Sequence, residues 1–226
     1  MGALYRTGQQ GTNAGQGGYG AALLRFSRPH TVLASSVQVA SLYLLAGGPA
    51  AAPVAALLLT WAAALAANLY VVGLNQLTDV AIDRLNKPAL PLASGALTPR
   101  GALALVLLAG ATALLLAATQ GAPLALTLAT IMFIGTVYSL PPTRFKERAA
   151  AAALSIALAR GVVANVGVYS TFAGTPAAAP PALRVALVFF FGFGLVIALF
   201  KDIPDRAGDG QYGVGSFAVR WGARPA

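Results

Sequence analysis

The sequence predicts an all-α protein, a bundle of helices that crosses a membrane several times. Of its 226 residues, 58% are hydrophobic and only 9% are charged, whereas a soluble domain normally carries about 25% charged residues. Apolar stretches close to the ~20 residues that a helix needs to cross a bilayer recur along the chain. Backbone amides that face lipid find partners only within their own segment, so these stretches are expected to be helical.

Six segments are predicted to span the membrane. They leave two long polar stretches, over 77–100 after the second span and from 201 to the end after the sixth. Glycines at 47–48 and 121 mark tight turns between spans. The predicted spans are 32–50, 54–76, 101–119, 122–140, 149–171 and 183–201. Residues 1–20 lack an apolar targeting segment and are expected to form a mobile tail, with the transmembrane domain over 21–226.

The basic residues predict how the bundle is oriented. The 15 Lys and Arg residues outnumber the 6 Asp and Glu residues, which in a soluble protein would suggest nucleic-acid binding. With six spans, all but two of the bases fall on the side that holds the N-terminus; the exceptions are Arg160, inside the fifth span, and Arg184. This asymmetry follows the positive-inside rule, so we expect a lipid bilayer and no nucleic acid as partner.

Five of the six acidic residues form two short clusters on that basic side. The first contains Asn75, Asp79 and Asp83, and the spacing of four predicts that the three share one face of a continuous helix. Oxygen ligands arranged in this way suit Mg²⁺, which proteins hold with one or two carboxylates plus substrate phosphates and water. The chain has no Cys and one His, so thiolate and histidine-based zinc sites are excluded.

The second cluster follows the sixth span. It contains Asp202, Asp205 and Asp209, and Pro204 is expected to end or kink the helix there. The alternative is that both clusters are interfacial caps and ion pairs, such as Asp83 with Lys87. Carboxylates near helix C-termini oppose the helix dipole, so capping explains them poorly. Five uncompensated acids would also repel one another, which favours a bound divalent cation.

The bases around the acids distinguish two metal-binding functions. A transporter of divalent cations would use the acids but would be hindered by nearby positive charge. Carboxylate-held Mg²⁺ beside Lys and Arg is instead the expected environment of a diphosphate. The basic residues near the clusters are Arg84, Lys87, Arg144, Lys146, Lys201 and Arg206.

Several sequence stretches together resemble a known family. These are NQLTDVAIDRLNKPALPLASG at 75–95, KDIPDRAGDGQYGVGSFAVRWG at 201–222, FSRPHT at 26–31 and YSLPPTRFK at 138–146. The chain resembles the UbiA superfamily of intramembrane prenyltransferases over about 22–222, and within it the homogentisate prenyltransferases of tocopherol and plastoquinone synthesis. The stretches at 26–31 and 73–79 are nearest to the phytyl-transferring branch.

The resemblance implies a bundle normally of nine transmembrane helices around a central cavity, in a plastid or other photosynthetic membrane. Two Asp-rich motifs bind Mg²⁺ and an isoprenoid diphosphate, and a prenyl group is transferred to homogentisate, which loses its carboxylate. The chain ends just after the second motif. About three helices are therefore expected to be missing, and the activity of a chain truncated in this way is in question.

The resemblance also assigns roles to particular residues. One Mg²⁺ is expected on Asn75, Asp79 and Asp83, and a second on Asp205 and Asp209 with Asp202 in support. The bases expected to contact the diphosphate or the acceptor's carboxylate are Lys201, Lys87, Arg144 and Lys146. The residues expected to bind the substrates are Arg28, His30, Tyr138, Arg160 and Asn165.

Some of these roles have alternatives that the sequence leaves open. His30 can be a structural residue beside a span, and Tyr138 an interfacial anchor. Arg160 needs a partner within its span, either Asn165 or the acceptor's carboxylate. The acceptor can instead be chlorophyllide or 4-hydroxybenzoate, and the tail phytyl, geranylgeranyl or solanesyl. A divalent-cation transporter and a catalytically dead remnant are the remaining alternatives.

Overall fold

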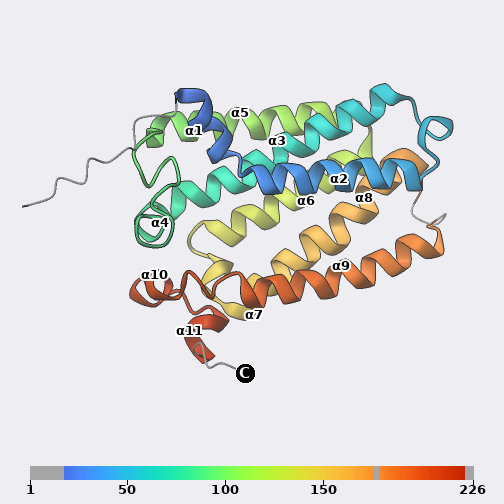
Figure 1. Ribbon diagram of the computed structural model, residues 1–226. Coiled ribbons are helices and arrows are strands. Elements are labelled where there is room, and N and C mark those ends of the chain that lie inside the picture. Colours follow the sequence, from blue (N-terminus) through green and yellow to red (C-terminus); the bar gives the residue numbers. More distant parts are fainter. Residues whose placement is uncertain (1–17, 176–178, 222–226) are drawn as a thin grey trace, which may run out of the picture.

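The computed structural model describes residues 18–175 and 179–221, and within them most of the chain is helical. Beyond one bridge pair between Arg148 and Gly215, no strand forms in these ranges. The long helices lie side by side along one axis, while the short α4, α10 and α11 gather at one end (Figure 1). The α-helices are α1 Tyr19–Phe26, α2 Pro29–Leu45, α3 Val54–Thr78, α4 Val80–Asn86, α5 Pro99–Thr119, α6 Ala122–Ser139, α7 Ala149–Ile156, α8 Ala164–Ala173, α9 Pro181–Phe200, α10 Arg206–Gln211 and α11 Phe217–Trp221. The 3₁₀-helices are η1 Gly48–Ala50 and η2 Phe145–Glu147, and η3 Ala157–Val163 is a π-helix.

Five of the six predicted spans are confirmed as helices long and apolar enough to cross a membrane. They are Val54–Thr78, Pro99–Thr119, Ala122–Ser139, Ala149–Ala173 and Pro181–Phe200. The segment predicted as a span at 32–50 is helix α2, which ends at Leu45 and has 17 residues. It ends early because Gly47 and Gly48 both take positive φ angles and start a turn. Its 17 residues rise roughly 25 Å, slightly less than the ~30 Å hydrocarbon core.

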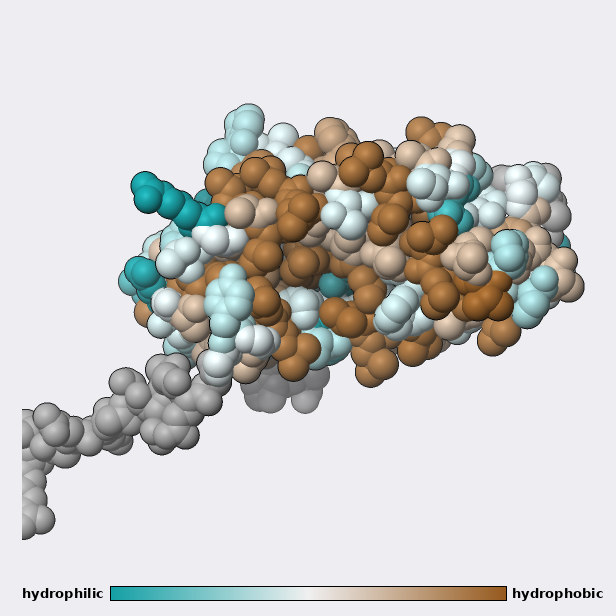
Figure 2. Space-filling view, turned by 90° about the horizontal axis from the view of Figure 1, so that it is seen from above, coloured by the Kyte–Doolittle hydropathy of each residue, from teal (hydrophilic) through white to brown (hydrophobic). Residues whose placement is uncertain are grey.

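The outer surface of the bundle is apolar, as a membrane requires. Hydrophobic residues cover most of the middle of the face seen in Figure 2, and polar residues gather toward its ends. Large side chains on α5, α6 and α9 are strongly exposed, among them Leu115 at 70%, Leu126 at 68% and Val188 at 78%. A soluble monomer rarely exposes so much contiguous apolar surface. The protein is therefore a multi-pass membrane protein.

Small residues bring the central helices together. Helix α3 packs against α2, α5 and α6, and alanines fill its contact with α5. Ala63, Ala67, Ala113 and Ala117 are all at most 2% exposed. Without a hydrophobic driving force between helices in lipid, such close contact is the main source of attraction. Buried alanines therefore hold the centre of the bundle together.

The predicted fifth span contains a π-helical middle, Ala157–Val163, where helix α9 packs against it. Gly161 makes this contact possible, because a Cβ added there would lie 2.7 Å from Phe191 Cα. The predicted tail at 1–20 lies mostly outside the described residues, and its last two residues, Tyr19 and Gly20, already belong to α1.

Replacing Gly161 by alanine is expected to destabilise the bundle by about 1–3 kcal/mol, because the new methyl group must displace the backbone of α9. Gly192→Ala in α9 is the matched control, since its Cβ would meet nothing within 4 Å. Thermal unfolding in detergent measures both variants. Equal melting temperatures for the two would contradict the close approach at Gly161.

Candidate active site

The structure brings the two acidic clusters together at one end of the bundle. Helix α4, which carries Asp83, packs against α10, which carries Asp209. An ion pair between Lys87 and Asp205 joins the two clusters directly. The loop from α6 to α7 reaches the same place, because the Gly215 amide donates to the Glu147 carbonyl at 3.0 Å. Three segments far apart in the sequence therefore build one polar site.

The prediction that one continuous helix carries the first cluster is wrong at Asp79. Helix α3 ends at Thr78, Asp79 takes the non-helical angles φ −114° and ψ 12°, and α4 begins at Val80. Lys146 accounts for the break, because its ammonium group contacts both the Thr78 hydroxyl, at 3.0 Å, and the Asp79 carboxylate. Asn75 nevertheless stays beside Asp79, with its Nδ2 donating to Oδ2 at 2.9 Å.

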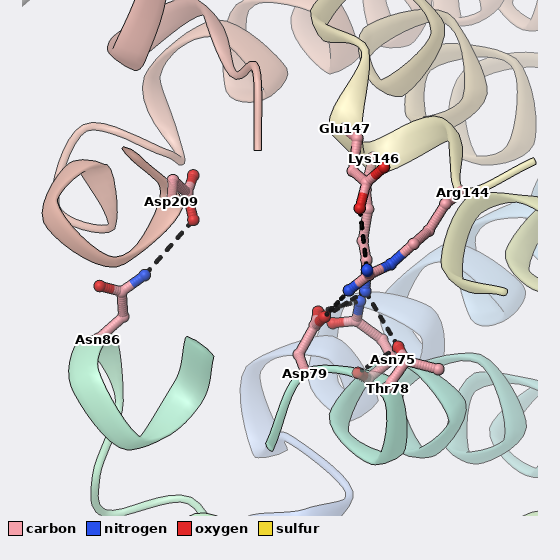
Figure 3. A network of polar contacts seen from close by, with 8 residues as sticks. All are labelled: Asn75, Thr78, Asp79, Asn86, Arg144, Lys146, Glu147 and Asp209. Atoms are coloured by element: carbon pink, nitrogen blue, oxygen red, sulfur yellow. Dashed lines mark hydrogen bonds and ion pairs between the residues drawn. The ribbon is translucent and has the colours of Figure 1, made fainter. Parts of the chain in front are cut away.

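Two bases from the α6–α7 loop surround the Asp79 carboxylate (Figure 3). Lys146 contacts it from a buried position, and Arg144 Nη2 lies 3.4 Å from Oδ1. Arg144 is oriented in turn by Glu147, whose Oε1 lies 2.9 Å from Nη1. Burial lowers the pKa of Lys146, although Asp79 opposes that shift. This arrangement holds two cations over one carboxylate.

Asn86 joins α4 to the second cluster by several hydrogen bonds. Its Nδ2 donates to the Asp205 carbonyl at 2.9 Å and lies 3.4 Å from Asp209 Oδ1 (Figure 3), and its Oδ1 accepts from the Gly208 amide at 3.0 Å. Asn86 was not among the residues singled out from the sequence. Its position three residues after Asp83, on the same face of a short helix, is the signal that could have revealed it.

Two buried carboxylates, Asp83 and Asp209, form no ion pair within 4 Å in the described part of the chain. Burial and the neighbouring Asp79 raise the pKa of Asp83 to about 6, and Asp205 adds to the effect. Burial together with Asp202 and Asp205 raises the pKa of Asp209 to about 6. Carboxylates that crowd in this way are short of positive charge, which suits a hard divalent cation.

The donor set fits Mg²⁺ that is shared with a substrate, and does not form a closed protein cage. In residues 18–175 and 179–221, no three His, Cys, Asp or Glu side chains are grouped closely enough to hold a metal ion by themselves. Mg²⁺ usually needs only one or two carboxylates, because phosphate oxygens and water complete its shell. The two predicted ligand sets thus stay predictions.

The other predicted residues near this end are arranged around the same site. Arg28 precedes α2 in a left-handed conformation (φ 53°) and lies near enough to Asp83 for its charge to oppose the rise in that pKa. Lys201 pairs with Asp202 and lies beside the Tyr138 hydroxyl. His30 lies exposed on the first turn of α2.

Arg160 and Asn165 lie apart from the acids, midway along their span. Asn165 was expected to pair with the Arg160 side chain, but among the described residues its side-chain amide instead donates to the backbone carbonyls of Arg160, at 3.1 Å, and Gly161, at 2.9 Å. Gln38 of α2 donates to the Asn165 side chain at 2.9 Å. The π-helix explains these bonds, because it leaves carbonyls without their usual partners. Gln38 was missed, although a polar residue within an apolar helix is itself a signal.

These features define a class: an integral membrane helical bundle with a polar site of carboxylates, lysines and arginines at one end. The sequence signature of the UbiA prenyltransferase family matches residues 34–226. The chain belongs to this family.

Individual relatives are similar over most of the chain. Homogentisate phytyltransferase of Synechocystis sp. is 40% identical over 210 residues, which cover 89% of this chain and 68% of that protein. Homogentisate phytyltransferase 1, chloroplastic, of Arabidopsis thaliana is 39% identical over 90% of this chain. This chain covers 54% of that plant protein.

A solved structure has the same fold. It is a UbiA homolog from Archaeoglobus fulgidus bound to GPP and Mg²⁺, with a TM-score of 0.72 and 24% identity, covering 89% of this chain and 69% of that one. The predicted helical bundle is thereby confirmed.

Proposed function

We propose that the protein transfers a prenyl group, phytyl in the first instance, from its diphosphate to homogentisate in tocopherol or plastoquinone synthesis. The observation that carries the proposal is the meeting of two acidic clusters and their bases at one end of the bundle. The 40% identity to a homogentisate phytyltransferase supports the choice of substrates. The plant relative's chloroplastic name and the cyanobacterial relative support a photosynthetic membrane.

Mg²⁺ held by the two clusters would neutralise the diphosphate and stabilise the charge that grows on it as it leaves. Asp83 and Asp209 are the strongest candidates for ligands, because both are buried and neither forms an ion pair within 4 Å among the described residues. Asp79 and Asp205 are already paired with lysines. When a diphosphate binds, Lys146 and Lys87 can turn from these carboxylates to phosphate oxygens, so charge balance is kept.

The reaction breaks the allylic C–O bond of the donor and leaves an allylic cation with the diphosphate anion. An electron-rich ring carbon of homogentisate attacks the cation. The ring then loses its proton, the side-chain carboxylate leaves as CO₂, and a proton takes its place. Water would quench the cation, and the apolar spans exclude it. The isoprenoid tail would lie among the Leu, Val and Phe side chains of those spans.

Arg160 is the best candidate for binding the acceptor's carboxylate. A guanidinium group within a span is costly and normally serves a function. Asn165 and Gln38 fix the backbone that carries it. Tyr138 and His30 remain candidates for the acceptor site on the side of the diphosphate.

Membranes that contain the protein are expected to convert homogentisate and radiolabelled phytyl diphosphate to a prenylated methylquinol and CO₂, and only when Mg²⁺ is present. Parallel reactions with geranylgeranyl and solanesyl diphosphate would show which prenyl donor the enzyme prefers. Reactions with 4-hydroxybenzoate in place of homogentisate would show whether it accepts another aromatic acid. Membranes with the Arabidopsis relative serve as the positive control. Uptake of a divalent cation into proteoliposomes without any prenylated product would show the proposal to be wrong and favour a transporter.

A further inference from the structure

Helix α10 lacks the usual cap at its N-terminus. Asp205 occupies the N-cap position, and an aspartate there normally accepts a hydrogen bond from the backbone amide two or three residues later. Here the Asp205 side chain makes no capping bond. Its carboxylate instead pairs with Lys87.

The missing cap comes from helix α4. Asn86, at the end of α4, accepts the Gly208 amide hydrogen at 3.0 Å, and Gly208 is the third residue of α10. The same side chain donates to the Asp205 carbonyl at 2.9 Å. The Asn86 side-chain amide therefore bonds both the Gly208 N–H group and the Asp205 carbonyl at the start of α10. An N-cap side chain would normally bond the N–H group.

The absence of a side chain at Gly208 makes room for the Asn86 amide. A Cβ added there would lie 2.3 Å from Asn86 Oδ1 and 2.7 Å from its Cγ, so any larger residue would push the Asn86 amide away. Gly210, two residues later in the same helix, would meet nothing within 4 Å. The need for glycine is thus specific to the place where Asn86 binds.

We propose that Asn86 is a positioning residue, which caps α10 from α4 and thereby keeps the Asp205 carboxylate turned away from its own helix, toward Lys87 and the metal–diphosphate site. The role given to the Asp205 carboxylate rests on the proposed function. The cap itself rests only on the geometry of Asn86 and α10. Without Asn86, the Asp205 carboxylate, as the N-cap side chain of α10, would be expected to accept the Gly208 amide hydrogen instead. Asp205 would then turn back onto its own helix, and the site would lose one of its charges.

Binding of Mn²⁺, a substitute for Mg²⁺ with the same preference for oxygen ligands, tests the inference without turnover. Titrations followed by electron paramagnetic resonance, with methylene diphosphonate as the diphosphate, are expected to show a loss of affinity of about ten- to a hundredfold in Asn86→Ala. Gly208→Ala should show the same loss. Gly210→Ala should bind as the unchanged protein does.

A double-mutant cycle separates positioning from general loosening of the fold. If Asn86 acts through Asp205, Asn86→Ala should cost little further affinity in a protein that already carries Asp205→Asn. Additive losses in the cycle would overturn the inference, as would unchanged Mn²⁺ affinity in both Asn86→Ala and Gly208→Ala. Asn86→Asp, which keeps the acceptor for Gly208, should retain more protection of the Gly208 amide against hydrogen exchange than Asn86→Ala does.

The exchange measurement also separates this inference from the proposed function. Absence of Mn²⁺ binding in the unchanged protein would overturn the proposed metal role, while amide exchange would still decide whether Asn86 caps α10. Equal exchange at Gly208 in the unchanged protein and Asn86→Ala would overturn the cap.

Discussion

Asp83→Asn is expected to stabilise the metal-free protein and at the same time to stop prenyl transfer. The carboxyl of Asp83 is buried, and burial with the nearby Asp79 raises its pKa from 3.8 to about 6. Holding this group ionised at pH 8 therefore costs the folded state up to about 3 kcal/mol. Asparagine has a similar shape without the charge, so we expect the variant to gain about 1–3 kcal/mol of stability.

The pH dependence of that gain has a definite sign. Because the pKa of Asp83 is higher in the folded than in the unfolded state, the folded state binds more protons between about pH 4 and 6. The unchanged protein therefore loses stability as the pH rises through this window. The advantage of Asp83→Asn should be full above pH 6 and absent near pH 4. Thermal unfolding in detergent at several pH values measures it.

Mg²⁺ should reverse the order of stability. An ion that binds only the folded state stabilises it by about 4.1 kcal/mol at a thousand times its Kd, which exceeds the expected advantage of the variant. The unchanged protein should gain this increment with Mg²⁺ and diphosphate, and Asp83→Asn should not. Its turnover should fall about 10²- to 10³-fold, as when one group that stabilises developing charge is removed. An Asp83→Asn protein that is less stable at pH 8, or that keeps its turnover, would contradict this assignment.

The sequence predicted the long-range features of the fold because they depend on composition and length. Five helices follow from apolar stretches near the bilayer thickness, and their turns fall at Gly47 and Gly121, where a positive φ is required. The charge asymmetry likewise placed both acidic clusters on one side. These signals are properties of each segment, so they need no knowledge of which helices are neighbours.

The interior of the site could not be predicted, because it depends on contacts between segments. The helix break at Asp79 arises from Lys146, which is 67 residues away in the sequence. The carbonyl of Arg160 in the π-helix is bonded by Asn165 and by Gln38 of another helix, a contact that local spacing does not reveal. The spacing of four between Asn75, Asp79 and Asp83 predicted one continuous helix. It could not reveal the contact of Asp79 with Lys146, at the place where the helix is broken.

Lys146→Met is expected to damage both stability and turnover, for separable reasons. The side chains of Lys146 and Asp79 are only 7% and 13% exposed. Removing one partner of such a pair leaves a buried charge, at a cost of about 3–5 kcal/mol. Arg144, at 3.4 Å, compensates in part, so we expect the lower end of that range. Turnover should fall about 10²- to 10³-fold, because a cation preorganised for the leaving diphosphate is lost.

Adding Asp79→Asn to Lys146→Met separates the two effects. The double variant leaves no charge unpaired between these positions, so most of the lost stability should return. Turnover should stay low, since both the cation and the carboxylate of the site are absent. Lys87→Met is the comparison for stability: the Lys87 side chain is 42% exposed and only its partner Asp205, at 12%, is buried, so we expect a smaller loss of stability than in Lys146→Met, where both partners are buried. Recovery of turnover together with stability in the double variant would mean that Lys146 serves only to neutralise Asp79.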